Sequence, residues 1–344
     1  MPDFEPPSSE TPKGQPRGTR TVGAPSRPRR AETRTRPANP QTQTSAEASG
    51  ALPATGPRVV ALGGGHGLAA VLMAARQYAS AVDAIVSIAD DGGSSGRLRR
   101  TYGATPPGDV RRCLLALANC DAQWSELFAY RFAGGELDDH AIGNLMLVAL
   151  ESQHGSFRDA IAACEQLLST VGHIHPATTE PVVLQAIGPD GVVEGQYAVQ
   201  RTPGLKRLEL LGTPTATPAA LEALRRADQI ILAPGSLFTS VLPVIGVPEI
   251  AAAISEANAQ VISVGNLEPE IPETEGLNGA DHAQAILDHG GRIDTLLIDP
   301  SGALPFEAAV IANLGITCVK EPMAAADGRT HDPHGLARAL RALL

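Results

Sequence analysis

The fold is decided by residues 59–67, VVALGGGHG, and by residues 84–97, AIVSIADDGGSSGR. In both stretches a short apolar run is followed by a glycine-rich loop and then by residues with helical spacing. Continuous apolar runs of this length are typical of buried parallel strands. A glycine-rich loop between a strand and a helix brings bare backbone N–H groups and a helix N-terminus to a phosphate. We therefore predict two parallel strands whose loops share one ligand cleft.

Composition and charge narrow the classes of partner. Of the 344 residues, 43% are hydrophobic but only 3% are aromatic, which favours α/β layers over a base-stacking surface. The formal net charge is −10. Residues 1–57 hold eight of the 27 Lys and Arg but five of the 37 Asp and Glu, so the remainder carries −13. An acidic body without a basic stripe argues against nucleic acid or anionic lipid as the main partner.

The cysteines and the apolar runs predict neither a metal cluster, a disulfide framework nor a membrane span. Cys113, Cys120, Cys164 and Cys318 are isolated, without the C-x-x-C spacing of a zinc site. No run reaches about 18 apolar residues, and the N-terminus has no apolar signal segment. We expect free thiols, no membrane insertion and a cytoplasmic location.

Two regions are expected along the chain. Residues 1–57 are rich in Pro, Thr, Ser and Arg and poor in bulky apolar side chains, so we predict a disordered tail. Residues 58–344 are predicted to form one α/β domain with a Rossmann-like, doubly wound, mostly parallel sheet. Residues 180–211 predict a small antiparallel β insert. The strands expected in this insert are residues 182–187, 192–199 and 206–211.

Capping residues predict where two helices begin. Asp109 is expected to be the N-cap of an amphipathic helix, and Thr217 followed by Pro218 is expected to begin another. Arg111 and Arg112, in the first of these helices, either reach the ligand cleft or lie on a solvated face. The solvated face is favoured, because long charged side chains usually keep their heads in water.

The first glycine-rich loop differs from a dinucleotide fingerprint, because the third glycine of G-x-G-x-x-G would fall at Leu68. His66 in this loop either hydrogen-bonds a phosphate or simply stands at the helix start. Asp90 and Asp91 follow the second strand, where one would bind a ribose, base or hydroxyl and another would hold Mg²⁺. The alternative is that both acids cap the following helix. A functional role is favoured because two adjacent acids exceed what capping needs.

Residues 92–96, GGSSG, match the nucleophile elbow G-x-S-x-G, so a serine hydrolase is a third interpretation. Acids just before the nucleophile would oppose an oxyanion, which argues against it. We expect Ser94 and Ser95 to donate hydrogen bonds to phosphate oxygens, with Arg97 supplying charge. His173 and His175 alternate like two metal ligands on a strand, but a third ligand is missing nearby, so a metal role is disfavoured.

Five motifs occur in a fixed order: GGGHGL at 63–68, ADDGGSSGRL at 89–98, PPGD at 106–109, HAIGNL at 140–145 and PGSLFTS at 234–240. In this order they resemble the YvcK branch of the CofD-like family, also called gluconeogenesis factors. The resemblance covers residues 58–330. The chain departs from the family pattern at Asp139, where glycine is usual, and in the segment after Asn266, where Leu277 replaces a common tyrosine.

The resemblance implies a Rossmann-like fold and a cytoplasmic bacterial protein that binds a UDP-sugar, notably UDP-N-acetylglucosamine. It also implies a role in cell shape and peptidoglycan synthesis when carbon flows through gluconeogenesis. CofD itself, a more distant relative, transfers phospholactate to a deazaflavin with magnesium. The alternative function is therefore a Mg²⁺-dependent transferase of the 2-phospho-L-lactate transferase type, with Asp90 or Asp91 as the catalytic residue and Mg²⁺ ligand.

We interpret the chain as a regulator that binds its ligand without turnover, because no pair of nucleophile and base is identifiable by spacing. Expected partners are a nucleotide sugar and proteins of cell-wall synthesis or its regulation, and a homo-oligomer is expected. No metal is assigned beyond the candidate Mg²⁺. The residues expected to bind the ligand are Gly63, Gly64, Gly65, His66, Gly67, Asp90, Asp91, Ser94, Ser95, Gly96, Arg97, Asp109, His140, Asn144, Gly235, Ser236 and Asn266.

Overall fold

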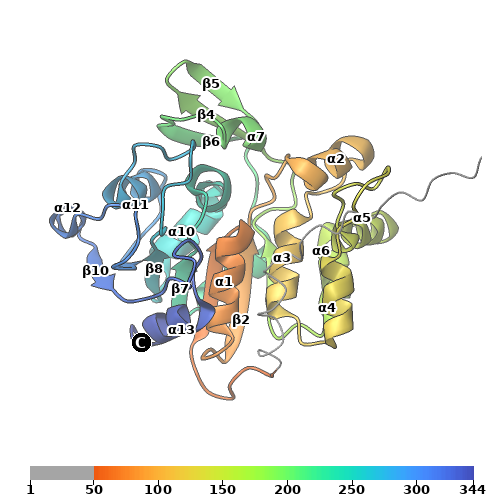
Figure 1. The fold of residues 1–344 in the computed structure, drawn as a ribbon, viewed down its shortest axis with the longest axis horizontal. Helices are drawn as coiled ribbons and strands as arrows, with labels where there is room; N and C mark the ends of the chain where they lie inside the picture. The colour runs from red at the N-terminus through yellow and green to blue at the C-terminus, as the bar shows by residue number, and fades with distance from the viewer. Residues whose placement is uncertain (1–49) are drawn as a thin grey trace, which may run out of the picture. The chain divides into compact units, whose positions relative to one another are not determined.

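A computed structural model describes residues 50–344 and contains a seven-stranded, fully parallel sheet with the order β10-β9-β8-β7-β1-β2-β3 (Figure 1). Its strands are β1 (Arg58–Gly63), β2 (Ala81–Val86), β3 (His173–Pro176), β7 (Gln229–Leu232), β8 (Gln260–Val264), β9 (Thr295–Ile298) and β10 (Thr317–Lys320). The chain runs outward from β1 to β3 on one side and from β7 to β10 on the other. Such a reversal of strand order leaves a crevice outside the carboxyl ends of β1 and β7.

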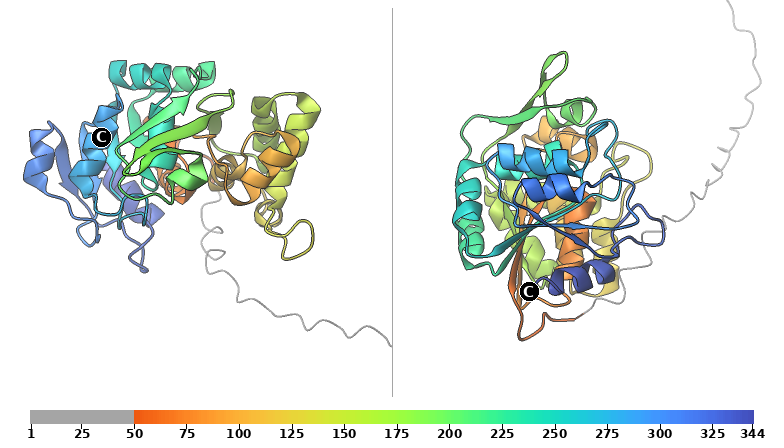
Figure 2. Two further views of the ribbon diagram at one scale, coloured as in Figure 1. Left: turned by 90° about the horizontal axis from the view of Figure 1, so that it is seen from above. Right: turned by 90° about the vertical axis from the view of Figure 1, so that its left-hand side faces the viewer.

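Helices cover both faces of this sheet, as two further views show (Figure 2). The helices are α1 (Gly65–Ala75), α2 (Gly93–Tyr102), α3 (Gly108–Leu117), α4 (Ala122–Ala129), α5 (Ile142–His154), α6 (Phe157–Leu168), α8 (Pro218–Arg226), the π-helix η2 (Leu237–Val241), α9 (Leu242–Ile245), α10 (Pro248–Glu256), α11 (Gly279–Asp288), α12 (Ala308–Asn313) and α13 (Pro333–Arg341). The predicted Rossmann-like, doubly wound α/β fold is confirmed.

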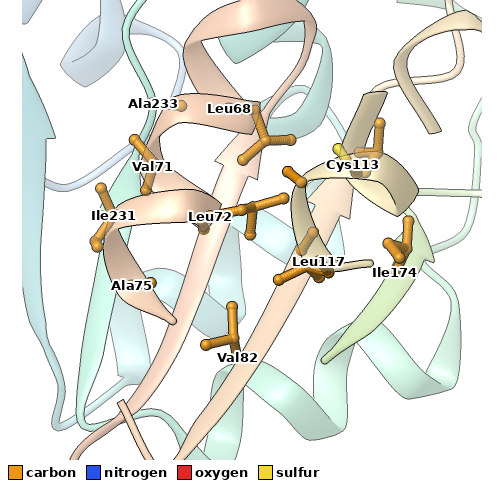
Figure 3. Packing of buried hydrophobic residues seen from close by; sticks show 14 of the residues in the cluster. Leu68, Val71, Leu72, Ala75, Val82, Cys113, Leu117, Ile174, Ile231 and Ala233 are labelled. Atoms are coloured by element: carbon orange, nitrogen blue, oxygen red, sulfur yellow. The ribbon is translucent and has the colours of Figure 1, made fainter. Parts of the chain in front are cut away.

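Alternate residues of β1 belong to two separate hydrophobic clusters. Val59 and Ala61 pack with α1, α3, α6 and α13, whereas Val60 and Leu62 pack with α8 to α12. Figure 3 shows part of the first cluster, where Leu72 of α1 lies between the strands and α3. A strand that is buried on both faces reads as a continuous apolar run, which is why residues 59–62 predicted it correctly.

The predicted antiparallel insert is confirmed, and it forms a sheet of its own with the order β5-β4-β6. Its strands are β4 (Val183–Gly188), β5 (Gly191–Glu194) and β6 (Arg207–Leu211). The strand predicted over 192–199 was too long, because Gly195 has a φ of 89° and the short helix α7 (Gln196–Val199) begins directly after it. We call these three strands with α7 the small sheet.

Local capping was predicted with mixed success. Pro218 is the first residue of α8 and Thr217 is its N-cap, as expected. The prediction for Asp109 was wrong, because Pro107 is the N-cap of α3 and Asp109 lies in the first turn. The carboxylate of Asp109 binds Arg112 of the same helix instead, at 2.6 Å between Oδ1 and Nη1.

The end of the predicted tail lies within the described residues, whereas residues 1–49 lie outside them, so their disorder stays a prediction. In residues 50–57, Leu52 packs against the first hydrophobic cluster, and the carbonyl of Gly56 accepts a hydrogen bond from Ser80 Oγ at 2.7 Å. Within residues 50–344, no single helix has the length and apolar character to cross a membrane. One pair bent by 74°, Leu237–Ile245 with Pro248–Glu256, passes by length and composition alone.

Candidate functional site

The N-termini of α1, α2 and α3 meet outside the carboxyl ends of β1 and β2. Their N-cap residues are Gly64, Gly92 and Pro107, and none of the three supplies a capping side chain. A Cβ placed on Gly64 would overlap the carboxylate of Asp109, and a Cβ on Gly108 would lie 2.7 Å from Ser95 Oγ. The first turns therefore touch one another. Their free N–H groups and helix dipoles give the meeting point the character of an anion site.

Gly67 brings the first loop against the loop after β7. A Cβ on Gly67 would overlap the backbone carbonyl of Pro234, so no larger residue fits there. The two loops lie on either side of the point where the strand order reverses, between the parallel neighbours β1 and β7. The glycine at this position is thus required by close packing at the crevice where ligands of this fold class bind.

Two carboxylates, those of Asp90 and Asp109, and the guanidinium group of Arg112 lie at this meeting point. Asp90 lies against the start of α3, because a Cβ on Gly108 would be 3.0 Å from Asp90 Oδ2. Burial, and next the negative charge of Asp109, raise the pKa of Asp90, while the Gly92 N–H donates to Asp90 at 3.0 Å and lowers it. Partial desolvation, followed by the charge of Arg112, lowers the pKa of His66. These shifts favour the neutral form of His66 and make Asp90 harder to ionise than an exposed aspartate.

A buried chain of hydrogen bonds joins α2, α3 and α5 behind the serines. Arg97 Nε donates to His140 Nε2 at 3.1 Å, and His140 Nδ1 lies 2.9 Å from Ser94 Oγ. Asn144 Nδ2 donates to Ser94 Oγ at 3.2 Å, and Arg111 Nε donates to Asn144 Oδ1 at 3.1 Å. Four predicted site residues are thereby brought together, namely Arg97, His140, Ser94 and Asn144. Arg111 joins them against expectation, since it is only 7% exposed rather than solvated.

This chain of hydrogen bonds fixes the chemistry of Ser94. An arginine can only donate, so His140 Nε2 is the acceptor and its Nδ1 carries the proton when the ring is neutral. Desolvation, and next the charge of Arg97, lower the pKa of His140, which favours that neutral ring. His140 therefore donates to Ser94 and has no free lone pair with which to take the proton of a nucleophile. The geometry opposes the serine hydrolase interpretation.

Asp91 contacts a helix more than 100 positions away in sequence. Its carboxylate accepts hydrogen bonds from the backbone N–H groups of Gln196, at 2.9 Å, and Tyr197, at 2.7 Å. Asp91 thus caps α7 of the small sheet. Of the two acids, only Asp90 hydrogen-bonds the start of the following helix, through Gly92. The second glycine-rich loop is consequently tied to the small sheet.

The loop after β7 is held by residues from the loop after β8. Asn266 forms two hydrogen bonds with the backbone of Gly235, at 2.8 and 2.9 Å. Ser236 Oγ donates to the carboxylate of Glu273 at 2.7 Å, and the Phe238 N–H donates to it at 2.6 Å. Glu273 is 1% exposed, and the sequence analysis missed it. No local pattern marks it, because its burial depends entirely on these distant partners.

Several of the predicted residues border three separate places in the structure. Gly64, Ser95 and Asp109 border the meeting point of the three helices. Asp91 and Gly96 line a groove of about 720 Å³ between α2 and the small sheet. Gly235 and Asn266 line a small cavity of about 20 Å³ beside α11.

Metal ligands are scarce among the described residues. Residues 50–344 contain no group of three or more His, Cys, Asp or Glu placed to hold a metal ion. His173 and His175 bind separate carboxylates, those of Glu165 and Asp83, at 3.3 and 2.7 Å. The carboxylates of Asp90 and Asp109 supply oxygen donors of the kind that Mg²⁺ prefers.

Comparison with known proteins gives consistent matches. A family model described as 2-phospho-L-lactate transferase CofD matches residues 59–314. A putative gluconeogenesis factor of Nostoc sp. is 43% identical over 235 residues, which is 67% of this chain and 52% of the relative. One of Deinococcus radiodurans is 38% identical over 84% of this chain and 66% of the relative. A gluconeogenesis factor of Listeria innocua is 40% identical over 71% of this chain and 78% of the relative.

Solved structures agree with these matches. The crystal structure of a UPF0052 family protein from Bacillus halodurans has a TM-score of 0.77 and 30% identity, covering 83% of this chain and 99% of the other. The chain spans about half the length of the Nostoc relative and 66% of the Deinococcus relative.

Proposed function

The chain belongs to the CofD family, and from this premise we propose that it is a regulatory protein of the gluconeogenesis-factor type that binds a UDP-sugar, UDP-N-acetylglucosamine, in the cytoplasm. Its role would be to adjust cell shape and peptidoglycan synthesis during gluconeogenic growth. The observation that carries the proposal is the meeting of three helix N-termini that lack capping side chains. Backbone donors left free at such a point suit a diphosphate.

The diphosphate would lie between the first turns of α1 and α2. The nearby carboxylates of Asp90 and Asp109 would repel it unless a cation is bound. Mg²⁺ held by these two carboxylates would neutralise that repulsion. Arg112, already paired with Asp109, adds positive charge at the same place.

Regulation without turnover fits the hydrogen bonds around Ser94, which leave it without a base. The hydrogen bond from the N–H of Gln196 in α7 to Asp91 could transmit ligand binding to a surface that a partner protein contacts. A ligand at the N-terminus of α2 would contact the second glycine-rich loop. A shift of that loop would move Asp91 and thereby α7 of the small sheet. We propose that proteins of cell-wall synthesis or its regulation read that surface, and that the protein acts as a homo-oligomer.

Thermal unfolding with UDP-N-acetylglucosamine tests this function. A ligand that binds only the native state at 100 times its Kd stabilises it by about 2.7 kcal/mol. We expect that shift for the natural chain with Mg²⁺, and its loss in Asp109→Asn. Asp327→Asn, in an exposed loop, is the matched control and should retain it. A natural chain whose melting is unmoved by the nucleotide would contradict the proposal.

The charge interaction between Asp90 and Asp109 favours a second candidate, a Mg²⁺-dependent transferase. Burial, and next the charge of Asp109, raise the pKa of Asp90, and a carboxylate with a raised pKa can take a proton from an acceptor hydroxyl. Release of free nucleotide from a UDP-sugar and Mg²⁺, followed by chromatography and abolished in Asp90→Asn, would support it. If the nucleotide sugar stays intact after prolonged incubation with acceptor alcohols, the transferase candidate is contradicted and ligand binding remains the proposed function.

A further inference from the structure

The groove between α2 and the small sheet, about 720 Å³, begins at the second glycine-rich loop. Its volume lies in the range of sites for small molecules, roughly 300–1,000 Å³. Gly92, Gly93 and Gly96 line it from α2 without side chains, and Tyr197 of α7 and Val183 of β4 line it from the small sheet (Figure 1). The groove is therefore continuous with the N-terminus of α2, and its lining there is backbone.

Charged side chains of both signs line this groove. Arg99 and Arg100 of α2 supply two guanidinium groups, and Asp91 and Glu194 supply two carboxylates. Together these four side chains carry no net formal charge, so the groove favours neither an anion nor a cation. It offers N–H donors and carboxylate acceptors within one space. Because a hydroxyl group both donates and accepts hydrogen bonds, a neutral ligand with several hydroxyls matches this lining.

The polar groups lie close to the start of α2. A Cβ on Gly96 would be 3.2 Å from Arg100 Nη1, so this guanidinium lies near Gly96, one helical turn or about 4.5 Å along the axis from Gly93. Arg99 Nη2 donates to the carbonyl of Val182 at 3.0 Å, which fixes its position. Glu194 accepts a hydrogen bond from Gln185 Nε2 at 3.0 Å. A carboxylate can accept about four such bonds, so Glu194 retains acceptor capacity for a ligand.

Tyr197 brings an aromatic ring to the same place. A Cβ on Gly92, the N-cap of α2, would be 3.7 Å from Tyr197 Cδ2. The guanidinium of Arg201 lies over one face of the ring, 3.8 Å from its centroid, but Tyr197 is still 53% exposed. An aromatic side chain with an apolar face and a polar hydroxyl suits a hexose ring, which has apolar C–H groups and polar hydroxyls.

We propose that this groove holds the uncharged sugar of the nucleotide sugar, with the hexose ring packed against Tyr197. Its hydroxyls hydrogen-bond Arg99, Arg100 and Glu194. The inference rests on the proposed function, which places the diphosphate between the first turns of α1 and α2. A sugar attached to that diphosphate continues past the N-cap of α2 into the groove. N-acetylglucosamine carries no charge, in keeping with the balanced charges of the lining, and its binding joins α2 to the small sheet.

Calorimetry on the full chain with Mg²⁺ tests this by comparing UDP-N-acetylglucosamine with UDP, which lacks the sugar. The readout is the Kd of UDP divided by the Kd of UDP-N-acetylglucosamine, because a change at the diphosphate alters both values alike. We expect Tyr197→Leu to lower this ratio about tenfold and Arg100→Gln to lower it about fivefold. Tyr197→Phe keeps the aromatic ring and should retain the ratio. Tyr130→Leu, whose tyrosine is 52% exposed, is the matched control and should retain it too.

The two groove variants and the two controls separate the outcomes. A ratio that falls in Tyr197→Leu and Arg100→Gln, and is retained in Tyr197→Phe and Tyr130→Leu, supports the inference. A ratio that stays the same in either groove variant, or that falls as far in either control, overturns it and leaves UDP-sugar binding standing. Arg100 is exposed, so its variant gives the answer even where Tyr197→Leu does not fold. Failure of the natural chain to bind UDP-N-acetylglucosamine overturns the proposed function, and the inference with it.

Discussion

Replacement of Glu273 by glutamine should stabilise the protein at neutral and alkaline pH. The carboxylate is 1% exposed, and this burial raises its pKa from 4.5 to about 7. Hydrogen bonds from Ser236 Oγ and the Phe238 N–H oppose the rise only in part. Glutamine keeps the shape and an oxygen for the Phe238 N–H, and its amide can donate to Ser236 Oγ. It carries no charge that must be buried.

The magnitude follows from linkage between protonation and folding. Because the folded pKa is the higher one, the favourable contribution of Glu273 is fully present below pH 4.5 and is lost as the pH rises through 7. Each pH unit between the unfolded and folded pKa values changes the free energy of unfolding by about 1.4 kcal/mol, so the loss amounts to about 3 kcal/mol. The free energy of unfolding of Glu273→Gln should therefore match that of the natural chain near pH 4.5 and exceed it by up to about 3 kcal/mol at pH 8.

Urea unfolding followed by circular dichroism, at several pH values between 4.5 and 8, measures this difference. Glu256→Gln, at an exposed site at the end of α10, is the matched control and should change stability by less than about 0.5 kcal/mol at every pH. A difference between Glu273→Gln and the natural chain that stays constant with pH would refute the reasoning. So would a variant that is less stable at pH 8.

Three further predictions concern the site. Gly67→Ala should cost about 2 kcal/mol or more, because its Cβ would overlap a backbone carbonyl, whereas Gly50→Ala meets nothing within 4 Å and should be neutral in the same urea titration. Asn144→Leu should cost about 2–4 kcal/mol, because it leaves the buried Arg111 Nε without its acceptor and removes one of the two donors to Ser94, and a stability equal to that of the natural chain would contradict this. A fluorophosphonate should not label Ser94, and mass spectrometry that finds the adduct would restore the hydrolase interpretation.

Much of the fold could be predicted from local patterns. The run at 59–62 is apolar at every position because β1 is buried on both faces, and the glycines that follow mark the turn into α1. The small antiparallel sheet was predicted from alternation around Gly188–Gly191. The length of its second strand was not predicted correctly. The chain turns at Gly195 because Asp91, far away in the sequence, accepts a hydrogen bond from the N–H of Gln196.

The sequence by itself determined the first buried strand, the glycine-rich loops after β1 and β2, and the small antiparallel sheet, because periodicity and glycine placement record local backbone conformation. Only the tertiary structure decided what each polar side chain touches. In the folded chain Asp91 accepts a hydrogen bond from α7, Glu273 accepts one from Ser236, and His140 donates one to Ser94. Those partners lie between 37 and 106 positions apart, and a hydrogen bond across such separations depends on how whole elements pack.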